Sequence, residues 1–325
     1  MKKILMIATG GTIASKNVGG GLQPVISSGD LLNHVPEIAA KCNVKTIQPF
    51  NLDSTNLAPC RWLELARIVE ENYEQYDGFV ITHGTDTMAY TAAALSYLIQ
   101  HSPKPVVLTG SQKSVYLRDT DARNNLYDAF SFCADEHACG VHVVFDGSVI
   151  LGTRAKKTRT KSYNAFSSID YPEIAIVRDG EPLYYIHEEK AKAPLFYHKL
   201  NERVFVLKLV PGVSPDIFDW LEKNCDGLVV ESFGSGGLPD YGDGAFFTRL
   251  KSFLAKGKSV VFTTQVEREG SALDKYAVGK RIFECGTTLE ARSMTLEATV
   301  TKLMWALATD NVNGNFTKPI ANDIL

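Results

Sequence analysis

The chain has 325 residues, of which 45% are hydrophobic and 22% are charged, and these values are ordinary for globular proteins. One hydrophobic core rarely supports this length, so we expect two domains. The 34 basic and 37 acidic residues give a formal net charge of -3, which offers no overall attraction to phosphate backbones or anionic membranes. We therefore expect no nucleic-acid partner and no membrane association.

The start of the chain has the basic residues of a signal peptide, but its apolar part is short and no cleavage site follows it. No later stretch has the length of a membrane-spanning helix. Six scattered cysteines without a CxxC pair are typical of reduced thiols. Cys133, His137 and Cys139 continue a helical pattern and lack a fourth ligand, so we expect no zinc there. A cytoplasmic location is the expectation.

Short apolar segments alternate with helical patterns from residue 1 to about 150. Apolar runs bounded by turn residues predict strands at 3–8, 44–50, 78–82, 106–109 and 141–145. Apolar residues at helical spacing predict helices at 58–73, 86–100 and 120–135. Such alternation predicts an α/β fold with a doubly wound, mostly parallel sheet.

A charged segment at 188–202 lacks periodicity and contains a proline, which is typical of a linker. After it the alternation resumes, with strands predicted at 204–209, 227–230 and 259–263 and helices at 214–224, 244–255 and 295–307. We expect a larger N-terminal catalytic α/β domain at 1–187, the linker at 188–202, and a smaller C-terminal α/β domain at 203–325.

Four polar clusters follow predicted strands, and the first is the glycine loop that contains Gly10, Gly11 and Thr12. Paired glycines let the backbone turn tightly and expose N–H groups to an anion or a developing oxyanion. A nucleotide-binding loop is the alternative. The spacing, however, matches neither the GxGxxG pattern nor the phosphate loop that ends in Gly-Lys.

The second and third clusters carry small hydroxyl groups and one carboxylate. Ser54 and Thr55 follow the strand at 44–50 and could bind a substrate carboxylate, or they could serve only as turn residues. Thr85 and Asp86 stand where the strand at 78–82 gives way to a helix, which is where open α/β sheets place their chemistry. The alternative is that this pair caps the helix.

The fourth cluster is a basic strip at 154–161 with five basic residues and no acidic one. A solvated surface strip is one interpretation. In the other, one lysine points inward, loses its proton readily and acts as a base. Together the clusters suggest a hydroxyl nucleophile, a second hydroxyl linked to a lysine, and a carboxylate that orients the lysine.

Five motifs give the whole chain a resemblance to the bacterial-type L-asparaginases, within the asparaginase/glutaminase family. The motifs are Thr9-Gly10-Gly11-Thr12-Ile13-Ala14, Asn51-Leu52-Asp53-Ser54-Thr55, His83-Gly84-Thr85-Asp86-Thr87-Met88, Thr109-Gly110-Ser111-Gln112 and Gly152-Thr153-Arg154-Ala155-Lys156-Lys157. The Asn-Leu-Asp-Ser-Thr form and the absence of a secretion signal are most similar to the cytoplasmic, type I branch.

The resemblance implies hydrolysis of the side-chain amide of L-asparagine to L-aspartate and ammonia through a threonine acyl-enzyme. Thr12 would attack the amide carbon, with Thr85, Lys157 and Asp86 as the supporting triad. Whether Thr12 or Thr85 attacks first stays open, and Thr12 is our choice. The choice of Lys157 over Lys156 depends on the alignment of the basic strip to the family pattern.

The same resemblance implies the substrate contacts and the assembly. Ser54 and Asp86 would hold the α-carboxylate and α-amino groups, with Thr55 beside them. The family is built as homotetramers, dimers of dimers, with sites shared between subunits. The implied chemistry uses side chains and backbone donors alone, so we expect no metal and no organic cofactor.

Two positions depart from the family pattern. A tyrosine that pairs with the nucleophile is common after the first loop, but Leu22 stands there and cannot relay a proton. We expect Tyr276 to supply this relay, although a packing role for this tyrosine is an equal alternative. Relatives also often offer an asparagine where this chain has Ser235, which leaves the contact from the neighbouring subunit and the tolerance of glutamine open.

Two other functions are alternatives. The amidohydrolase subunit of an archaeal-type tRNA amidotransferase resembles this family, but it carries an additional N-terminal domain, whereas the glycine loop here begins at Thr9. An amino-acid binding module without turnover is the second alternative. The presence of all four candidate catalytic residues argues for the enzyme.

Overall fold

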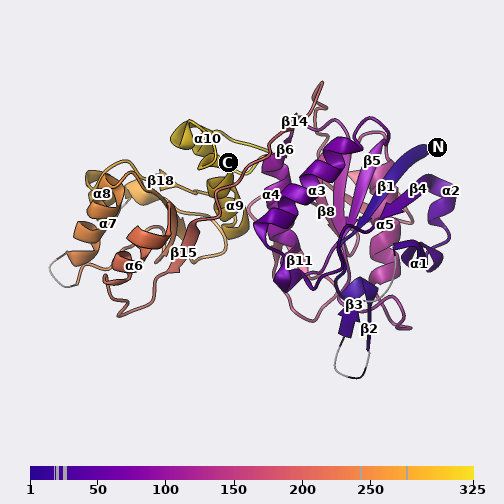
Figure 1. Ribbon diagram of the computed structural model, residues 1–325, viewed down its shortest axis with the longest axis horizontal. Helices are drawn as coiled ribbons and strands as arrows, with labels where there is room; N and C mark the ends of the chain where they lie inside the picture. The colour runs from indigo at the N-terminus through magenta and orange to yellow at the C-terminus, as the bar shows by residue number, and fades with distance from the viewer. Residues whose placement is uncertain (18, 20–21, 25–27, 242–243, 276) are drawn as a thin grey trace. The chain divides into compact units, whose positions relative to one another are not determined.

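The computed structural model describes residues 1–325 except 18, 20–21, 25–27, 242–243 and 276. The chain divides into two compact units, Met1–His198 and Lys199–Leu325, and each contains a sheet packed against helices (Figure 1). The predicted α/β class, with a larger N-terminal and a smaller C-terminal domain, is confirmed. The division falls within 188–202, which we still propose as a linker. Among the described residues, no helix combines the length and apolarity needed to cross a membrane.

The described part of the first unit contains an eight-stranded sheet in the order β13-β12-β9-β8-β7-β5-β1-β4. Its strands are β1 (Lys2–Ala8), β4 (Cys42–Ile47), β5 (Gly78–Thr82), β7 (Pro105–Thr109), β8 (Gly140–Phe145), β9 (Ser148–Leu151), β12 (Ala175–Arg178) and β13 (Glu181–Tyr184). The first five in the chain match the predicted strands and run parallel, whereas β9, β12 and β13 form an antiparallel extension that the sequence analysis missed.

Parallel pairing brings the carboxyl ends of the central strands to one edge of this sheet. The register sets Ala8 of β1 beside Thr82 of β5, and Thr82 beside Thr109 of β7. Strands β5 and β7 are buried along their whole length and are almost continuously apolar, because helices cover both faces of a parallel sheet. The loops that leave these ends carry the candidate site residues.

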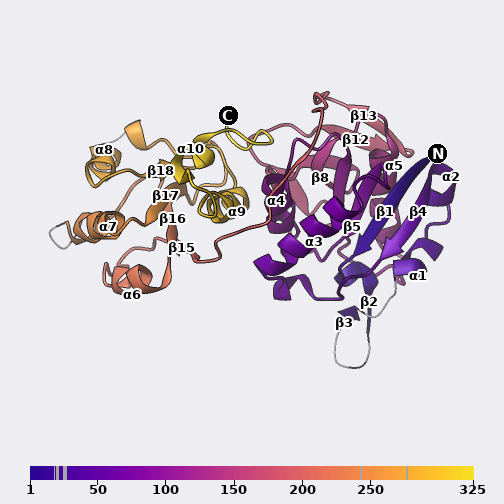
Figure 2. The same ribbon diagram turned by 45° about the horizontal axis from the view of Figure 1, so that its top comes forward.

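Helices cover both faces of the first sheet (Figures 1 and 2). They are α1 (Ser28–Asn33), α2 (Ile38–Lys41), α3 (Pro59–Glu71), α4 (Met88–Leu98) and α5 (Ala122–Ala134). Alternate residues of β1, among them Ile4 and Met6, pack with α1, α2 and α5 in one hydrophobic cluster, while α3 and α4 lie on the opposite face (Figures 1 and 2).

The end of α5 corrects one expectation from the sequence. The helix predicted at 120–135 agrees with α5, which ends at Ala134, but the expectation that His137 and Cys139 continue its pattern is wrong, because Asp135 is extended. The carboxylate of Asp135 accepts a hydrogen bond from the backbone N–H of His137 at 2.8 Å, which stabilises a turn in place of another helical turn. Within the described residues, no group of three or more His, Cys, Asp and Glu side chains could hold a metal ion.

Short antiparallel pairs complete the first unit. They are β2 (Ser15–Asn17) with β3 (Leu22–Pro24), β6 (Ile99–Gln100) with β14 (Leu195–Phe196), and β10 (Ala155–Lys157) with β11 (Phe166–Ser168). The pairing of β10 with β11 sets Lys157 opposite Phe166, which holds the backbone of the basic strip in a defined place.

The described part of the second unit contains a four-stranded parallel sheet in the order β15-β16-β17-β18. Its elements are β15 (Val204–Lys208), α6 (Ile217–Asn224), β16 (Gly227–Ser232), α7 (Ala245–Ala255), β17 (Ser259–Thr264), α8 (Ala277–Glu284), β18 (Leu289–Glu290), α9 (Leu296–Ala306) and α10 (Val312–Thr317). A cluster rich in phenylalanine joins α6 and α7 to one face of the sheet, and α9 packs on the other (Figure 2).

Candidate active site

The glycine loop follows β1, and its backbone conformation at positions 10 and 11 favours residues without a side chain. Gly10 and Gly11 have φ angles of 107° and 81°, a region that other residues rarely adopt. A Cβ on Gly10 would lie 2.5 Å from the carbonyl oxygen of Leu52. The N–H of Gly11 donates to that same oxygen at 3.0 Å, so the loop is tied to the segment that precedes Ser54.

Thr12 begins the short 3₁₀ helix η1 (Thr12–Ala14), for which Gly11 is the cap residue. The hydroxyl of Ser15 donates to the carbonyl of Gly11 at 2.8 Å, which stabilises the conformation of the loop. Neither the hydroxyl nor the amide N–H of Thr12 bonds to another residue that the structure describes. Both groups of Thr12 are therefore available to a ligand.

Ser54 and Thr55 lie in the 3₁₀ helix η2 (Ser54–Asn56). Asp53 caps this helix, and its carboxylate accepts hydrogen bonds from the backbone N–H and from the hydroxyl of Thr55, both at 2.9 Å. Thr55 is exposed and its hydroxyl is engaged locally. Ser54 is buried, and its hydroxyl oxygen would lie only 2.6 Å from a Cβ placed on Gly84.

The third loop contains Gly84, Thr85 and Asp86 and meets the other two. The hydroxyl of Thr87 donates to the carbonyl of Ser54 at 2.8 Å, which joins this loop to η2. A Cβ on Gly11 would lie 2.4 Å from the amide nitrogen of Gly84, so the glycine loop packs directly against it. The loops that follow β1, β4 and β5 thus converge at the carboxyl edge of the sheet.

Lys157 connects the two polar side chains of the third loop. Its Nζ lies 2.7 Å from the Thr85 hydroxyl oxygen and 2.6 Å from Oδ1 of Asp86. The exposed fraction is 16% for the Lys157 side chain and 58% for that of Asp86, while Thr85 is buried. The lysine is therefore held between a buried hydroxyl and a carboxylate that solvent or a ligand can reach.

His83 precedes this loop and is completely buried. Burial lowers its pKa to about 4, although the hydrogen bond between its ring and the carbonyl of Gly84 opposes the shift. The imidazole is therefore neutral at physiological pH. The sequence motif includes this histidine but indicates no role for it, because a lone histidine beside a strand carries no signal of its own.

Gln112, in the loop after β7, is a further residue at this edge. Its Oε1 lies 3.5 Å from the hydroxyl of Thr85, and its Nε2 donates to the carbonyl of Ser162 at 3.0 Å. The carboxylate of Asp121 accepts the backbone N–H of Gln112 at 2.8 Å. The sequence motif that includes Gln112 drew attention to this loop, but it did not indicate contact with Thr85.

Two family models together match most of the chain. Residues 3–190 match the family model described as asparaginase, N-terminal, and residues 203–316 match that of the glutaminase/asparaginase C-terminal domain. The chain belongs to the asparaginase family. The resemblance inferred from the sequence motifs is therefore confirmed.

Individual members of the asparaginase family are similar along nearly the whole chain. An L-asparaginase of Thermococcus kodakarensis is 41% identical over 310 residues, covering 94% of this chain and 92% of the relative. A solved structure of the thermostable L-asparaginase from Thermococcus kodakarensis, 39% identical, has a TM-score of 0.91 and covers 99% of both chains. A probable cytoplasmic L-asparaginase from Campylobacter jejuni, 27% identical, has a TM-score of 0.86 and covers 98% of this chain and all of the other.

One interpretation of the basic strip is wrong in part. A uniformly solvated strip would leave every long side chain in water, but Arg154 is completely buried and its guanidinium lies 5.5 Å from the ring centroid of Tyr171. Only the part of the strip beyond Thr158 is exposed. The strip therefore passes from the interior to the surface, and Lys157 stands near the transition.

Three residues were named for departures from the family pattern, and the structure describes two of them, Ser235 and Leu22. Tyr276 lies outside the described residues, so its role as a relay stays a prediction. Ser235 lies in the second unit, in the turn between Phe233 and Gly237, where its carbonyl accepts the N–H of Ala272 at 2.8 Å. Leu22 begins β3, and its backbone pairs with Asn17 of β2.

Proposed function

We propose that this protein hydrolyses the side-chain amide of L-asparagine to L-aspartate and ammonia. The contact of Lys157 with both Thr85 and Asp86 carries the proposal, because it joins a hydroxyl, an amine and a carboxylate at the loop that packs against the glycine loop of Thr12. Membership of the asparaginase family and similarity to proteins named L-asparaginase support it.

In the proposed first step, the hydroxyl oxygen of Thr12 attacks the amide carbon of the substrate. A C–O bond forms, the C–N bond breaks, and the hydroxyl proton leaves with the nitrogen as ammonia. Water then attacks the acyl-enzyme, frees aspartate and returns a proton to Thr12. The absence of a hydrogen-bond partner for this hydroxyl among the described residues supports Thr12 as the nucleophile.

Thr85 and Lys157 would move the protons of the second step. With its amine neutral, Lys157 can accept the hydroxyl proton of Thr85, and Thr85 can in turn accept a proton from the attacking water. Asp86 would hold the lysine in place. The amide N–H groups of Thr12 and Thr85 bond to no other described residue, so they can stabilise the oxyanion that develops in both steps.

Ser54 and Asp86 would hold the α-carboxylate and the α-amino group of the substrate. Ser54 is buried against Gly84, so its hydroxyl is fixed next to the loop that carries the chemistry. The exposed carboxylate of Asp86 can reach an ammonium group. Thr55 is a weaker candidate for contact than the sequence suggested, because its hydroxyl already donates to Asp53.

Steady-state kinetics on asparagine and on glutamine, with ammonia release as the measured signal, test this function. We expect asparagine turnover, and a loss of kcat on the order of 10³-fold or more in Thr12→Ala and Thr85→Ala. Thr248→Ala removes an exposed hydroxyl on α7 and is the control variant, which should keep native kinetics. Mass spectrometry of acid-quenched reactions identifies the nucleophile, since the acyl group would be found on the peptide containing Thr12. Absence of asparagine hydrolysis in the native protein refutes the proposal.

A second candidate comes from another group of relatives. A glutamyl-tRNA(Gln) amidotransferase subunit from Methanosphaera stadtmanae is 34% identical over 331 residues, covering 96% of this chain and 74% of the relative. This function would require preference for glutamine over asparagine. The same kinetic comparison therefore separates the two candidates.

We also propose a homotetramer, a dimer of dimers, and a cytoplasmic location. Family membership supports the assembly, and the description of the Campylobacter jejuni relative as cytoplasmic supports the location. Light scattering after size-exclusion chromatography tests the first, and a mass of one or two chains would contradict it. Cell fractionation tests the second.

A further inference from the structure

A line of buried polar groups connects helix α3 to the loop that carries Thr85. The indole Nε1 of Trp62 on α3 lies 3.0 Å from the hydroxyl oxygen of Thr91 on α4. That oxygen lies 2.9 Å from Nε2 of His83, and Nδ1 of His83 lies 2.6 Å from the carbonyl oxygen of Gly84. Trp62, Thr91 and His83 are all buried.

The chemistry of the groups fixes the direction of every hydrogen bond in this line. A carbonyl oxygen can only accept, so the contact with Gly84 requires the proton of His83 to be on Nδ1. A neutral imidazole carries one proton, so its Nε2 is an acceptor and receives the hydroxyl proton of Thr91. An indole N–H can only donate, so the Thr91 oxygen accepts from Trp62. The low pKa of His83 agrees with a neutral ring.

The last of these bonds sets the plane of the peptide that joins Gly84 to Thr85. A trans peptide is planar, so its C=O and N–H point in opposite directions. With the carbonyl held by His83, the N–H of Thr85 is turned away from the histidine. This N–H bonds to no other group in the described part of the chain, although Thr85 is buried, and an unpaired buried donor is rare in a folded protein.

We propose that His83 is a positioning residue, which holds the Gly84–Thr85 peptide so that the N–H of Thr85 is fixed for the substrate oxyanion, with Trp62 and Thr91 stabilising the tautomer of His83 that bears its proton on Nδ1. This inference rests on the proposed amide hydrolysis. It explains why two helices that carry none of the candidate site residues are tied to the loop by directional bonds. A packing role alone would place no demand on which ring nitrogen bears the proton.

Nitrogen-15 NMR of the histidine rings of the native protein tests the direction of the bonds without using activity. The histidine signal that disappears in His83→Gln belongs to His83, and we expect it to show a neutral ring at pH 7 with the proton on Nδ1. If this signal instead shows a proton on Nε2, or a charged ring at pH 7, the inference is overturned. This measurement stands whether or not the protein proves to hydrolyse asparagine.

Two matched pairs of variants test the effect on turnover. An asparagine at position 83 can place an amide N–H near the position of Nδ1, whereas a glutamine places its amide farther out, near Nε2. We expect His83→Gln to lower kcat roughly 10-fold or more with little change in KM, since an oxyanion donor acts in the transition state, and His83→Asn to retain more of kcat. Thr91→Val should lower kcat in the same way, and Thr91→Ser should restore it.

The outcomes separate failure of this inference from failure of the function. If the native protein does not turn over asparagine, the proposed function itself is wrong. If the native protein turns over asparagine but His83→Gln and His83→Asn have equal kcat, or Thr91→Val has unchanged kcat, the positioning role is wrong. Losses of kcat that follow the melting temperature of each variant, regardless of the group retained, also overturn it, because they indicate a purely structural role.

Discussion

Gly11 and Gly84 come so close that a Cβ on Gly11 would lie 2.4 Å from the amide nitrogen and 2.5 Å from the Cα of Gly84. These two residues follow different strands, β1 and β5, which pair in parallel. Their contact places Thr12 and Thr85, each one residue later, in neighbouring loops. The proximity of the two candidate threonines thus depends on the absence of side chains at both glycines.

We predict that Gly11→Ala abolishes most activity. The added methyl must push the glycine loop away from Gly84, and φ at Gly11 is also unfavourable for alanine. A displacement of this kind costs on the order of 10²-fold in kcat/KM. Gly212→Ala is the matched control, because Gly212 has a φ of 86° but no atom within 4 Å of the added carbon. Equal activity in the two variants would contradict the steric argument.

The sequence predicted the parallel part of the first sheet and the loops that carry chemistry. Continuous apolar runs such as Gly78–Thr82 have few alternatives to a buried strand, and the Thr85–Asp86 cluster stands shortly after this one. The contact of Lys157 with Thr85 could not be predicted from spacing alone. It depends on the β10–β11 pair, whose three-residue strands have too little pattern to be recognised.

The antiparallel strands were missed for a local reason. The β8–β9 and β12–β13 hairpins turn at Asp146-Gly147 and Asp179-Gly180, where all four residues have positive φ, and an Asp-Gly pair is a hairpin signal that the apolar pattern alone does not use. Other features depend on tertiary contacts. Arg154 is completely buried, although charged side chains are usually exposed, and no pattern in the sequence indicates this burial. The line of bonds through His83 joins residues up to 29 positions apart.

A second prediction distinguishes the two adjacent lysines of the basic strip. Lys157→Met should lower kcat by on the order of 10³-fold, because it removes the amine that lies within 2.7 Å of both Thr85 and Asp86. Lys156→Met makes the same chemical change one residue earlier, on the opposite side of strand β10. We expect it to keep near-normal kinetics. A larger loss in Lys156→Met would show that the strip was aligned wrongly.

The buried, neutral state of His83 predicts how stability depends on pH. Its pKa is about 4 in the folded protein and about 6.5 when unfolded, so the unfolded chain binds more protons between these values. The free energy of unfolding should therefore fall as the pH drops from 6.5 to 4, by on the order of 3 kcal/mol from this residue. Urea unfolding of the native protein and of His83→Gln at pH 7 and pH 4 measures this contribution. Identical losses in both proteins would contradict it.

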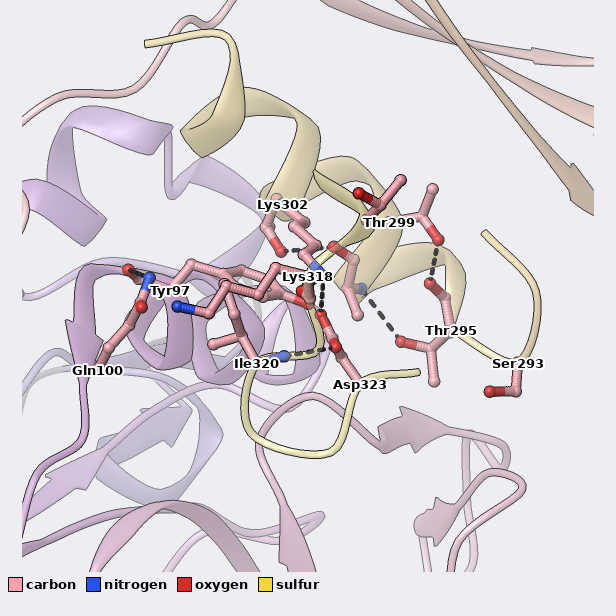
Figure 3. A network of polar contacts seen from close by, with 12 residues as sticks. Tyr97, Gln100, Ser293, Thr295, Thr299, Lys302, Lys318, Ile320 and Asp323 are labelled. Atoms are coloured by element: carbon pink, nitrogen blue, oxygen red, sulfur yellow. Dashed lines mark hydrogen bonds and ion pairs between the residues drawn. The ribbon is translucent and has the colours of Figure 1, made fainter. Parts of the chain in front are cut away.

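The C-terminal segment of the second unit is held by a completely buried ion pair (Figure 3). Nζ of Lys302, on α9, lies 2.7 Å from Oδ2 of Asp323 and donates to the carbonyl of Lys318 at 2.7 Å. Oδ1 of Asp323 accepts the N–H of Ile320 at 2.9 Å. Burial lowers the pKa of Lys302, and the nearby carboxylate opposes this shift.

Because both charges are removed from water, loss of one partner should cost far more than loss of the pair. We predict that Lys302→Met lowers the free energy of unfolding by roughly 3–5 kcal/mol, since it leaves a buried carboxylate uncompensated. Adding Asp323→Asn should recover much of this, because the amide is neutral and its oxygen can still accept the N–H of Ile320. Arg67→Met, which breaks an exposed pair with Glu71, should cost less than about 1 kcal/mol. Equal costs for the buried and exposed single variants, measured by urea unfolding, would show that burial does not govern this ion pair.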